Sequence, residues 1–155
     1  MTEPTPPRIL FLCSGNYYRS RFAEHLFNHL ASLATLPYQA DSAGLWPECH
    51  THNPGPMSHD TITALKQRGI ALPAVLRSPR DVRASDIAAA ALTIAVKEAE
   101  HRPIVERRFP ELLPRVEFWK IDDLDCAPAS VALPMIEEHV RALLARLSAQ
   151  AKPSR

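Results

Sequence analysis

The sequence predicts a single-domain α/β fold in which four strands form a parallel sheet. Its 155 residues fit one compact domain. Short, mainly apolar runs recur along the chain, and this pattern is typical of strands that are buried on both faces. Segments with apolar residues at helical spacing alternate with these runs, as in βαβ units whose parallel strands are joined by right-handed crossovers.

The first expected strand is the continuous apolar run Arg8–Cys13, RILFLC. A short polar loop follows it. A helix is expected from Ser20 onward, because apolar residues then recur at helical spacing. These residues are Phe22, Ala23, Leu26, Phe27 and Leu30. The second expected strand covers residues 38–43 and ends at Gly44.

The middle of the chain is expected to contain one helix between two irregular segments. Residues 45–56 form a loop rich in proline and histidine. Ser58 and Asp60 are candidate N-caps of the helix that follows, and Gly69 is expected to stop it. Residues 72–86 are then expected to form a long irregular or partly helical connection.

Two further strands and two helices complete the expected fold. Ala91–Val96 is the third strand, and a helix is expected from Glu98 to about Arg108, with Pro103 able to kink or delay it. Val116–Ile121 is the fourth strand. The last helix carries an apolar stripe made of Val131, Ile136, Val140, Leu143, Leu144 and Leu147.

The chain ends are expected to lie outside the folded domain. Residues 1–7, which are rich in proline, are expected to be a disordered lead, residues 8–148 the domain, and residues 149–155 a flexible tail. The pattern shows no internal repeat and no linker to a second domain.

Composition excludes several classes of protein. Lysine and arginine number 18 against 17 aspartate and glutamate, so the net charge of +1 is not the basic footprint of a nucleic-acid-binding domain. The longest apolar run, Ile87–Val96, is too short to span a membrane, and no apolar signal segment follows the N-terminus. Three widely spaced cysteines do not form a disulfide framework and favour a reducing compartment. We therefore predict a soluble, cytoplasmic protein that binds neither nucleic acid nor membranes.

The loop after the first strand has the features of an anion cradle. It reads Cys-Ser-Gly-Asn-Tyr-Tyr-Arg-Ser from Cys13 to Ser20 and leads into a helix. Gly15 and Asn16 tolerate the left-handed angles that turn successive N–H groups inward, and the N-terminus of a helix adds positive potential. Arg19 offers a two-pronged donor to an oxyanion. Such a field favours the thiolate of Cys13, a nucleophile suited to attack phosphorus.

Cys-x5-Arg alone is a weak signal, and a buried strand-end cysteine with a solvated arginine is the structural alternative. The context favours the cradle. The segment RILFLCSGNYYRSRFAEHLF resembles the phosphate-binding loop of the low-molecular-weight protein tyrosine phosphatases, a family shared with the thioredoxin-coupled arsenate reductases. The resemblance continues through DSAG (residues 41–44) and GPMSHDTITALKQRGI (residues 55–70), and covers about Arg8–Leu147. It implies a four-stranded parallel sheet with helices on both faces.

The resemblance also implies an activity and roles for particular residues. The activity is phosphomonoester hydrolysis, of the phosphotyrosine type, through a cysteinyl-phosphate on Cys13 and without a metal or other cofactor. Arg19 binds the phosphoryl group, and Ser20 and Ser42 support the loop together with Asn16. Substrates are phosphorylated proteins or small phosphate esters, and phosphate or sulfate should bind in the loop. The phosphate-binding residues are Ser14, Gly15, Asn16, Tyr17, Tyr18, Arg19 and Ser20.

The general acid is expected in the loop after the fourth strand, where the family has an aspartate that is usually followed by proline. Asp123 fits best, whereas Asp122 and Asp125 are competitors and a polar turn is the structural alternative. Leu124 stands where the proline is expected, so the loop lacks a fixed φ. A phosphate-binding module without efficient catalysis is therefore an alternative function.

Other features allow two interpretations each. Tyr17 and Trp46 are candidate walls of the substrate pocket, or partly packed core residues. Residues 49–52, Cys-His-Thr-His, resemble a metal cluster, but their spacing matches no common zinc pattern, so we interpret them as part of the loop. Arg77 and Arg80 are interpreted as solvated cations rather than binding residues. Residues 97–116 contain no cysteine, which disfavours arsenate reduction.

Overall fold

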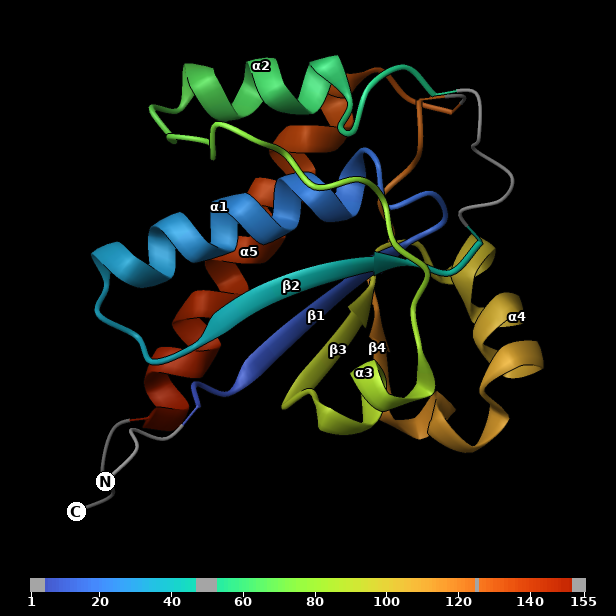
Figure 1. Cartoon of the computed structure of the whole chain (residues 1–155). Helices are drawn as coiled ribbons and strands as arrows, with labels where there is room; N and C mark the ends of the chain where they lie inside the picture. Colours follow the sequence, from blue (N-terminus) through green and yellow to red (C-terminus); the bar gives the residue numbers. More distant parts are fainter. Residues whose placement is uncertain (1–4, 47–52, 125, 152–155) are drawn as a thin grey trace.

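The computed structural model describes residues 5–46, 53–124 and 126–151, and its elements alternate as predicted (Figure 1). In chain order they are β1 (Arg8–Cys13), α1 (Arg19–Leu33), β2 (Gln39–Gly44), α2 (His59–Gln67), α3 (Ala84–Ala89), β3 (Leu92–Ala95), α4 (Glu98–Arg108), the 3-10 helix η2 (Pro110–Arg115), β4 (Val116–Phe118) and α5 (Ala129–Ala151).

The four strands form one parallel sheet in the order β2-β1-β3-β4. In the register of this sheet, Ile9 of β1 lies opposite Ala40 of β2 and Leu92 of β3. All strands point the same way, so their carboxyl ends meet at one edge, where ligands bind in open parallel sheets. The predicted α/β fold is confirmed.

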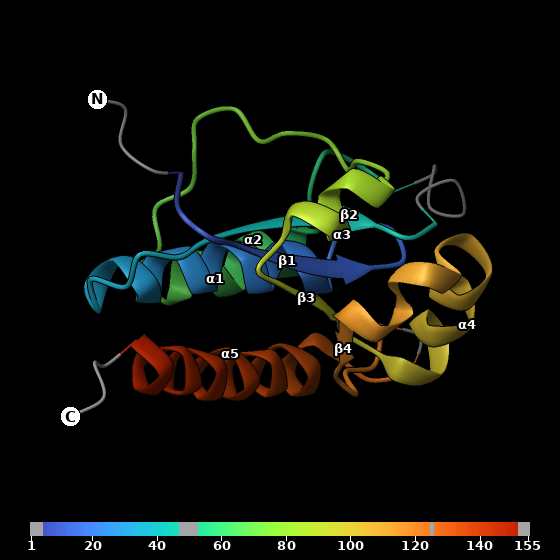
Figure 2. The same ribbon diagram turned by 90° about the horizontal axis from the view of Figure 1, so that it is seen from below.

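The continuous apolar sequence of β1 follows from burial on both faces. Ile9 and Phe11 pack in a core with α1 and α5, whereas Leu10 and Leu12 pack in a second core with residues of α3 and α4. Figures 1 and 2 show α1, α2 and α5 on one side of the sheet and α3 and α4 on the other. Successive strand side chains point to opposite faces, so both faces must be covered to bury this run.

The residues predicted to begin and end α2 lie at its two ends. Ser58 caps the helix, with its hydroxyl oxygen accepting a hydrogen bond from the N–H of Thr61 at 3.5 Å. Gly69 follows the helix with φ of +72°, a left-handed angle that favours glycine.

Some boundaries differ from the prediction. The connection predicted to be irregular or partly helical does include the start of the short helix α3, whereas η2 forms where no element was predicted. Pro103 lies inside α4 and does not delay it, because the helix begins at Glu98. The strand β4 ends at Phe118, although the N–H of Ile121 still donates to the carbonyl of Val96 at 2.8 Å.

None of the helices within residues 5–46, 53–124 and 126–151 is long and apolar enough to cross a membrane. The helix α5 continues to Ala151, and the predicted division into lead, domain and tail stays a prediction.

Candidate active site

The predicted cradle connects β1 to α1 at the carboxyl edge of the sheet (Figure 1). The loop packs closely on β2, because a Cβ on Gly44 would lie only 2.9 Å from the carbonyl oxygen of Ser14. Asn16 has φ of +51°, in the left-handed region that asparagine tolerates. A glycine on the neighbouring strand and an asparagine in the loop thus permit the tight winding.

The carbonyl groups of the loop bond outward. Those of Cys13 and Ser14 accept from the N–H groups of Leu45 (2.8 Å) and Trp46 (2.9 Å). Three more carbonyls have outside partners: Asn16 accepts from Arg21 Nη1, Tyr17 from the N–H of Ser58, and Tyr18 from the N–H of Phe22.

This arrangement fixes the direction of the loop amides. In a trans peptide the carbonyl and the following N–H point in opposite directions, and the structure contains no cis peptide among the described residues. The amides that follow these carbonyls therefore face the concave side of the loop. They belong to Ser14, Gly15, Tyr17, Tyr18 and Arg19.

The sulfur of Cys13 is buried and has a hydroxyl partner. Its Sγ lies 2.9 Å from Ser20 Oγ, and this oxygen accepts a hydrogen bond from Asn16 Nδ2 at 2.9 Å. A hydroxyl carries one hydrogen and two lone pairs, so Ser20 Oγ can accept from the amide and still donate its hydrogen to the sulfur. Asn16 Nδ2 also donates to Ser42 Oγ at 2.9 Å, so the residues predicted to support the loop lie in one network.

Arg77 is part of the same network, and its interpretation as a solvated cation is wrong. Its Nη1 donates to Asn16 Oδ1 at 2.9 Å, and its Nη2 donates to Ser42 Oγ at 2.9 Å. The backbone N–H of Arg80 also donates to Asn16 Oδ1, at 3.1 Å. The connection that precedes α3 therefore holds the asparagine at the centre of the loop.

Arg19 is almost fully buried and lies among acceptors. Its Nη1 and Nη2 each contact one carboxylate oxygen of Glu100 at 3.2 Å, and Nη1 also donates to the carbonyl of Ile121 at 2.9 Å. Burial acts to lower the pKa of Arg19, but the nearby charges of Cys13, Glu100 and Asp123 outweigh it and raise this pKa. Arg19 is a fixed cation at the edge of the cradle.

Glu100 and His101, from the first turns of α4, were not predicted as site residues. Burial acts to raise the pKa of Glu100, but hydrogen bonds with His101, Arg19 and Ser14 hold this pKa well below its usual range. Burial lowers the pKa of His101. In the sequence, the only sign of Glu100 is that acidic residues follow the third strand. Glu98 fits that sign as well as Glu100 does.

Among the predicted acids, Asp123 lies in the site. Its Oδ2 is 3.3 Å from Arg19 Nη2, and its Oδ1 accepts a hydrogen bond from the N–H of Leu124 at 2.8 Å. Asp122 is instead half-exposed and paired with Lys97 at 2.8 Å. Asp125 lies outside the described residues. Leu124 thus supplies an N–H that a proline would lack, and this N–H holds the carboxylate.

A hollow of about 210 Å³ opens over the cradle. Tyr17 forms part of its wall, and its hydroxyl donates to the carbonyl of Pro54 at 2.6 Å. Trp46 is 53% exposed, and its role as the opposite wall stays a prediction. The described residues that line the hollow are Cys13, Gly15, Tyr17, Tyr18, Arg19, Asn53, Asp123 and Leu124.

Tyr18, another wall residue, buries its hydroxyl without a hydrogen-bond partner among the described residues. Burial, together with the charge of Asp60, raises the pKa of Tyr18 to about 12. The phenol is therefore protonated at neutral pH, and its O–H has no acceptor among the described residues.

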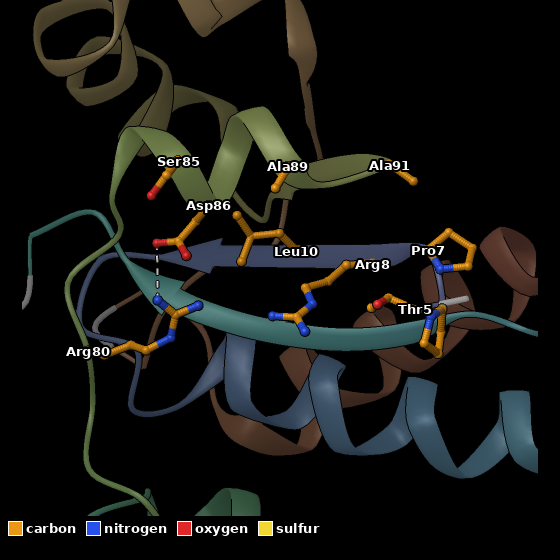
Figure 3. Close-up of a pocket in the computed structure, with 10 residues that line it drawn as sticks. Thr5, Pro7, Arg8, Leu10, Arg80, Ser85, Asp86, Ala89 and Ala91 are labelled. Carbon is orange, nitrogen blue, oxygen red and sulfur yellow. Dashed lines mark hydrogen bonds and ion pairs between the residues drawn. The ribbon is translucent and has the colours of Figure 1, made fainter. Parts of the chain in front are cut away.

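A second hollow, of about 510 Å³, lies beside α3 and has different chemistry (Figure 3). Arg80 in its wall pairs with Asp86 at 3.1 Å and with Asp41 at 2.9 Å, and Arg8 lies 3.6 Å from Asp41. These pairs balance the charges around this hollow. The nucleophile and the loop amides belong to the smaller hollow.

In the described part of the chain, no group of three or more His, Cys, Asp or Glu side chains could hold a metal ion. The stretch Cys-His-Thr-His at residues 49–52 lies outside the described residues.

Comparisons with known proteins agree with the geometry. The family model for low molecular weight phosphotyrosine protein phosphatase matches residues 8–152. No curated protein sequence matches the chain.

Solved structures share the fold. YfkJ from Bacillus subtilis is 22% identical, with a TM-score of 0.82 over 97% of this chain and 100% of its own. Wzb from Vibrio vulnificus, in complex with benzylphosphonate, is 17% identical, with a TM-score of 0.75 over 90% and 98%. The YwlE arginine phosphatase from Geobacillus stearothermophilus is 23% identical, with a TM-score of 0.73 over 97% and 100%. With a family match over nearly the whole chain, this protein belongs to the low molecular weight phosphotyrosine protein phosphatases and is a cysteine-dependent phosphomonoester hydrolase.

Proposed function

We propose that Cys13, Arg19 and Asp123 carry out the hydrolysis through a cysteinyl-phosphate. The observation that carries the proposal is the position of the Cys13 sulfur. It lies at the base of a loop whose amides face inward, 2.9 Å from the hydroxyl of Ser20. Converging N–H groups, a helix N-terminus and a hydroxyl surround this sulfur, and the thiolate is the reactive form of a cysteine.

In the first step the thiolate attacks phosphorus and the ester bond breaks. The loop amides and Arg19 bind the three non-bridging oxygens, whose charge they stabilise in the loose transition state. Asp123 donates its proton to the departing oxygen, so the products are an alcohol and a phosphate bonded to Cys13. Phosphate oxygens at Arg19 Nη2 replace the contact that Asp123 makes there at 3.3 Å, which frees the carboxyl group to face the leaving oxygen.

In the second step water releases the phosphate. The carboxylate of Asp123 takes a proton from the water, the water oxygen bonds to phosphorus, and the bond between sulfur and phosphorus breaks. The thiolate and the protonated acid are restored, and inorganic phosphate leaves. The cycle needs no metal or other cofactor, because amides and a guanidinium carry the positive field.

We favour aryl phosphates, such as phosphotyrosine in proteins, as the substrate class. The aromatic ring of Tyr17 and the apolar side chain of Leu124 line the hollow above the sulfur and suit contact with a flat ring. Phosphoarginine is the competing substrate, since a structural neighbour is an arginine phosphatase. A cytoplasmic location remains a prediction from cysteine usage.

Steady-state kinetics with p-nitrophenyl phosphate tests the assignment. Cys13→Ser should abolish turnover, and Asp123→Asn should lower kcat by about 10²–10⁴-fold. Asp122→Asn is the matched control, because it removes the same charge from a half-exposed neighbour that pairs with Lys97. Equal losses for Asp122→Asn and Asp123→Asn would overturn the choice of acid. Relative kcat/KM for a phosphotyrosine and a phosphoarginine peptide tests the substrate class.

A further inference from the structure

We propose that Glu100 is a positioning residue that aims Arg19 at the phosphoryl group. The inference rests on the proposed function, in which Arg19 binds the transferring group. Glu100 does not line the hollow over Cys13 among the described residues, so it acts through the arginine.

The contact between the two side chains is an end-on fork. Glu100 Oε2 accepts from Arg19 Nη1 and Oε1 accepts from Nη2, both at 3.2 Å. Paired bonds between a carboxylate and a guanidinium fix its plane as well as its position. The carbonyl of Ile121 takes the second Nη1 hydrogen at 2.9 Å. Three of the five N–H donors are therefore committed to the protein.

The two remaining donors share one edge of the guanidinium. They are the Nε hydrogen and the second Nη2 hydrogen. Arg19 Nε is buried and has no hydrogen-bond partner among the described residues, and Nη2 also lies 3.3 Å from Asp123 Oδ2. A buried donor without an acceptor is costly, so this edge is suited to an incoming anion. Two oxygens of a phosphoryl group match its spacing.

A second chain of bonds fixes Glu100 itself. The N–H of Lys97 donates to His101 Nδ1 at 3.0 Å, so the neutral ring carries its proton on Nε2. This Nε2 lies 3.1 Å from Ser14 Oγ and donates to it, and the Ser14 hydroxyl donates to Glu100 Oε1. The start of α4 thereby holds both the cradle, through Ser14, and its arginine, through Glu100.

Glu100→Gln against Glu98→Gln is the decisive comparison. Both substitutions remove one negative charge from the first turn of α4, but Glu98 pairs with Arg102 at the surface and does not contact Arg19. Glutamine keeps the shape of Glu100 and can accept only one of the two Arg19 bonds. We expect Glu100→Gln to lower kcat/KM for p-nitrophenyl phosphate and the affinity for inorganic phosphate by about 10–10²-fold, and Glu98→Gln to change neither.

A double-mutant cycle separates positioning from a general loss of structure. Ser14→Ala alone should weaken phosphate binding about threefold to tenfold. In the Glu100→Gln background it should cause little further loss, because Ser14 acts through Glu100. Fully additive losses, or equal kinetics for Glu100→Gln and Glu98→Gln, would overturn the proposal. If Glu100→Gln fails to fold, Ser14→Ala tests the same chain of bonds, and wild-type phosphate affinity in that variant overturns it.

Failure of the proposed function gives a different result. A wild-type protein that does not hydrolyse p-nitrophenyl phosphate contradicts the catalytic assignment. Calorimetric titration with inorganic phosphate still measures the effect of Glu100 on Arg19 in that case. Weaker binding to Glu100→Gln than to Glu98→Gln then supports the positioning role, and equal binding contradicts it.

Discussion

Gly44→Ala should damage the cradle from the neighbouring strand. The new Cβ would lie 2.9 Å from the carbonyl oxygen of Ser14, 3.2 Å from Asn16 Cβ and 3.3 Å from the backbone nitrogen of Asn16. The closest of these distances is shorter than real Cβ contacts, and two of the three atoms belong to the backbone. The loop must therefore shift by a few tenths of an ångström. Overpacking of this kind costs about 1–3 kcal/mol of stability.

The activity of Gly44→Ala should fall together with its stability. A displaced loop turns its amides away from the phosphoryl oxygens, and misplacement on this scale lowers kcat/KM by about 10–10²-fold. Hydrolysis of p-nitrophenyl phosphate and urea unfolding, measured on the same preparations, give both quantities. Gly69→Ala is the matched control. It places alanine at φ of +72° after α2 with no atom within 4 Å, so it should cost about 1 kcal/mol without changing kcat/KM. Wild-type kcat/KM in Gly44→Ala would refute this reasoning.

Three further perturbations follow from the site. Leu124→Pro removes the N–H that donates to Asp123 Oδ1, and kcat should fall about tenfold in steady-state assays, whereas Leu124→Ala keeps the N–H and should retain most of kcat. Tyr18→Phe removes a buried hydroxyl without a partner among the described residues, so the free energy of unfolding in urea should stay within about 1 kcal/mol of wild type or rise; a larger loss would show a missed hydrogen bond. Stability should fall as the pH drops below about 6.5, because burial lowers the pKa of His101 in the folded chain and the unfolded chain then binds a proton that the folded chain does not. Urea midpoints at several pH values measure this, and midpoints that rise on acidification would contradict it.

Local sequence was enough to predict the cradle. Cys13, Asn16 and Arg19 lie within one turn-forming segment between a strand and a helix, so their proximity needs no knowledge of the tertiary fold. The apolar pattern of β1 also predicted burial on both faces, because a strand with one face in water alternates apolar and polar residues.

The supporting residues depend on tertiary register and could not be predicted in this way. Arg77 reaches Asn16 from 61 positions along the chain, through an irregular connection whose path has no periodic signal. Glu98 and Glu100 are both acidic residues of the first turn of α4, and only the helix rotation decides which meets Arg19. Asp122 and Asp123 are neighbours in the sequence, which therefore does not decide which of them faces Arg19. Only the folded structure shows that Asp122 pairs with Lys97.

Chemical trapping of the intermediate tests the central claim most directly. Asp123→Asn protein mixed with p-nitrophenyl phosphate, quenched in acid within the first turnover and digested, should yield a peptide with phosphate on Cys13, and Cys13→Ser protein treated in the same way should not release p-nitrophenol. Phosphate on another side chain, or wild-type turnover without any phosphate on Cys13, would contradict the account.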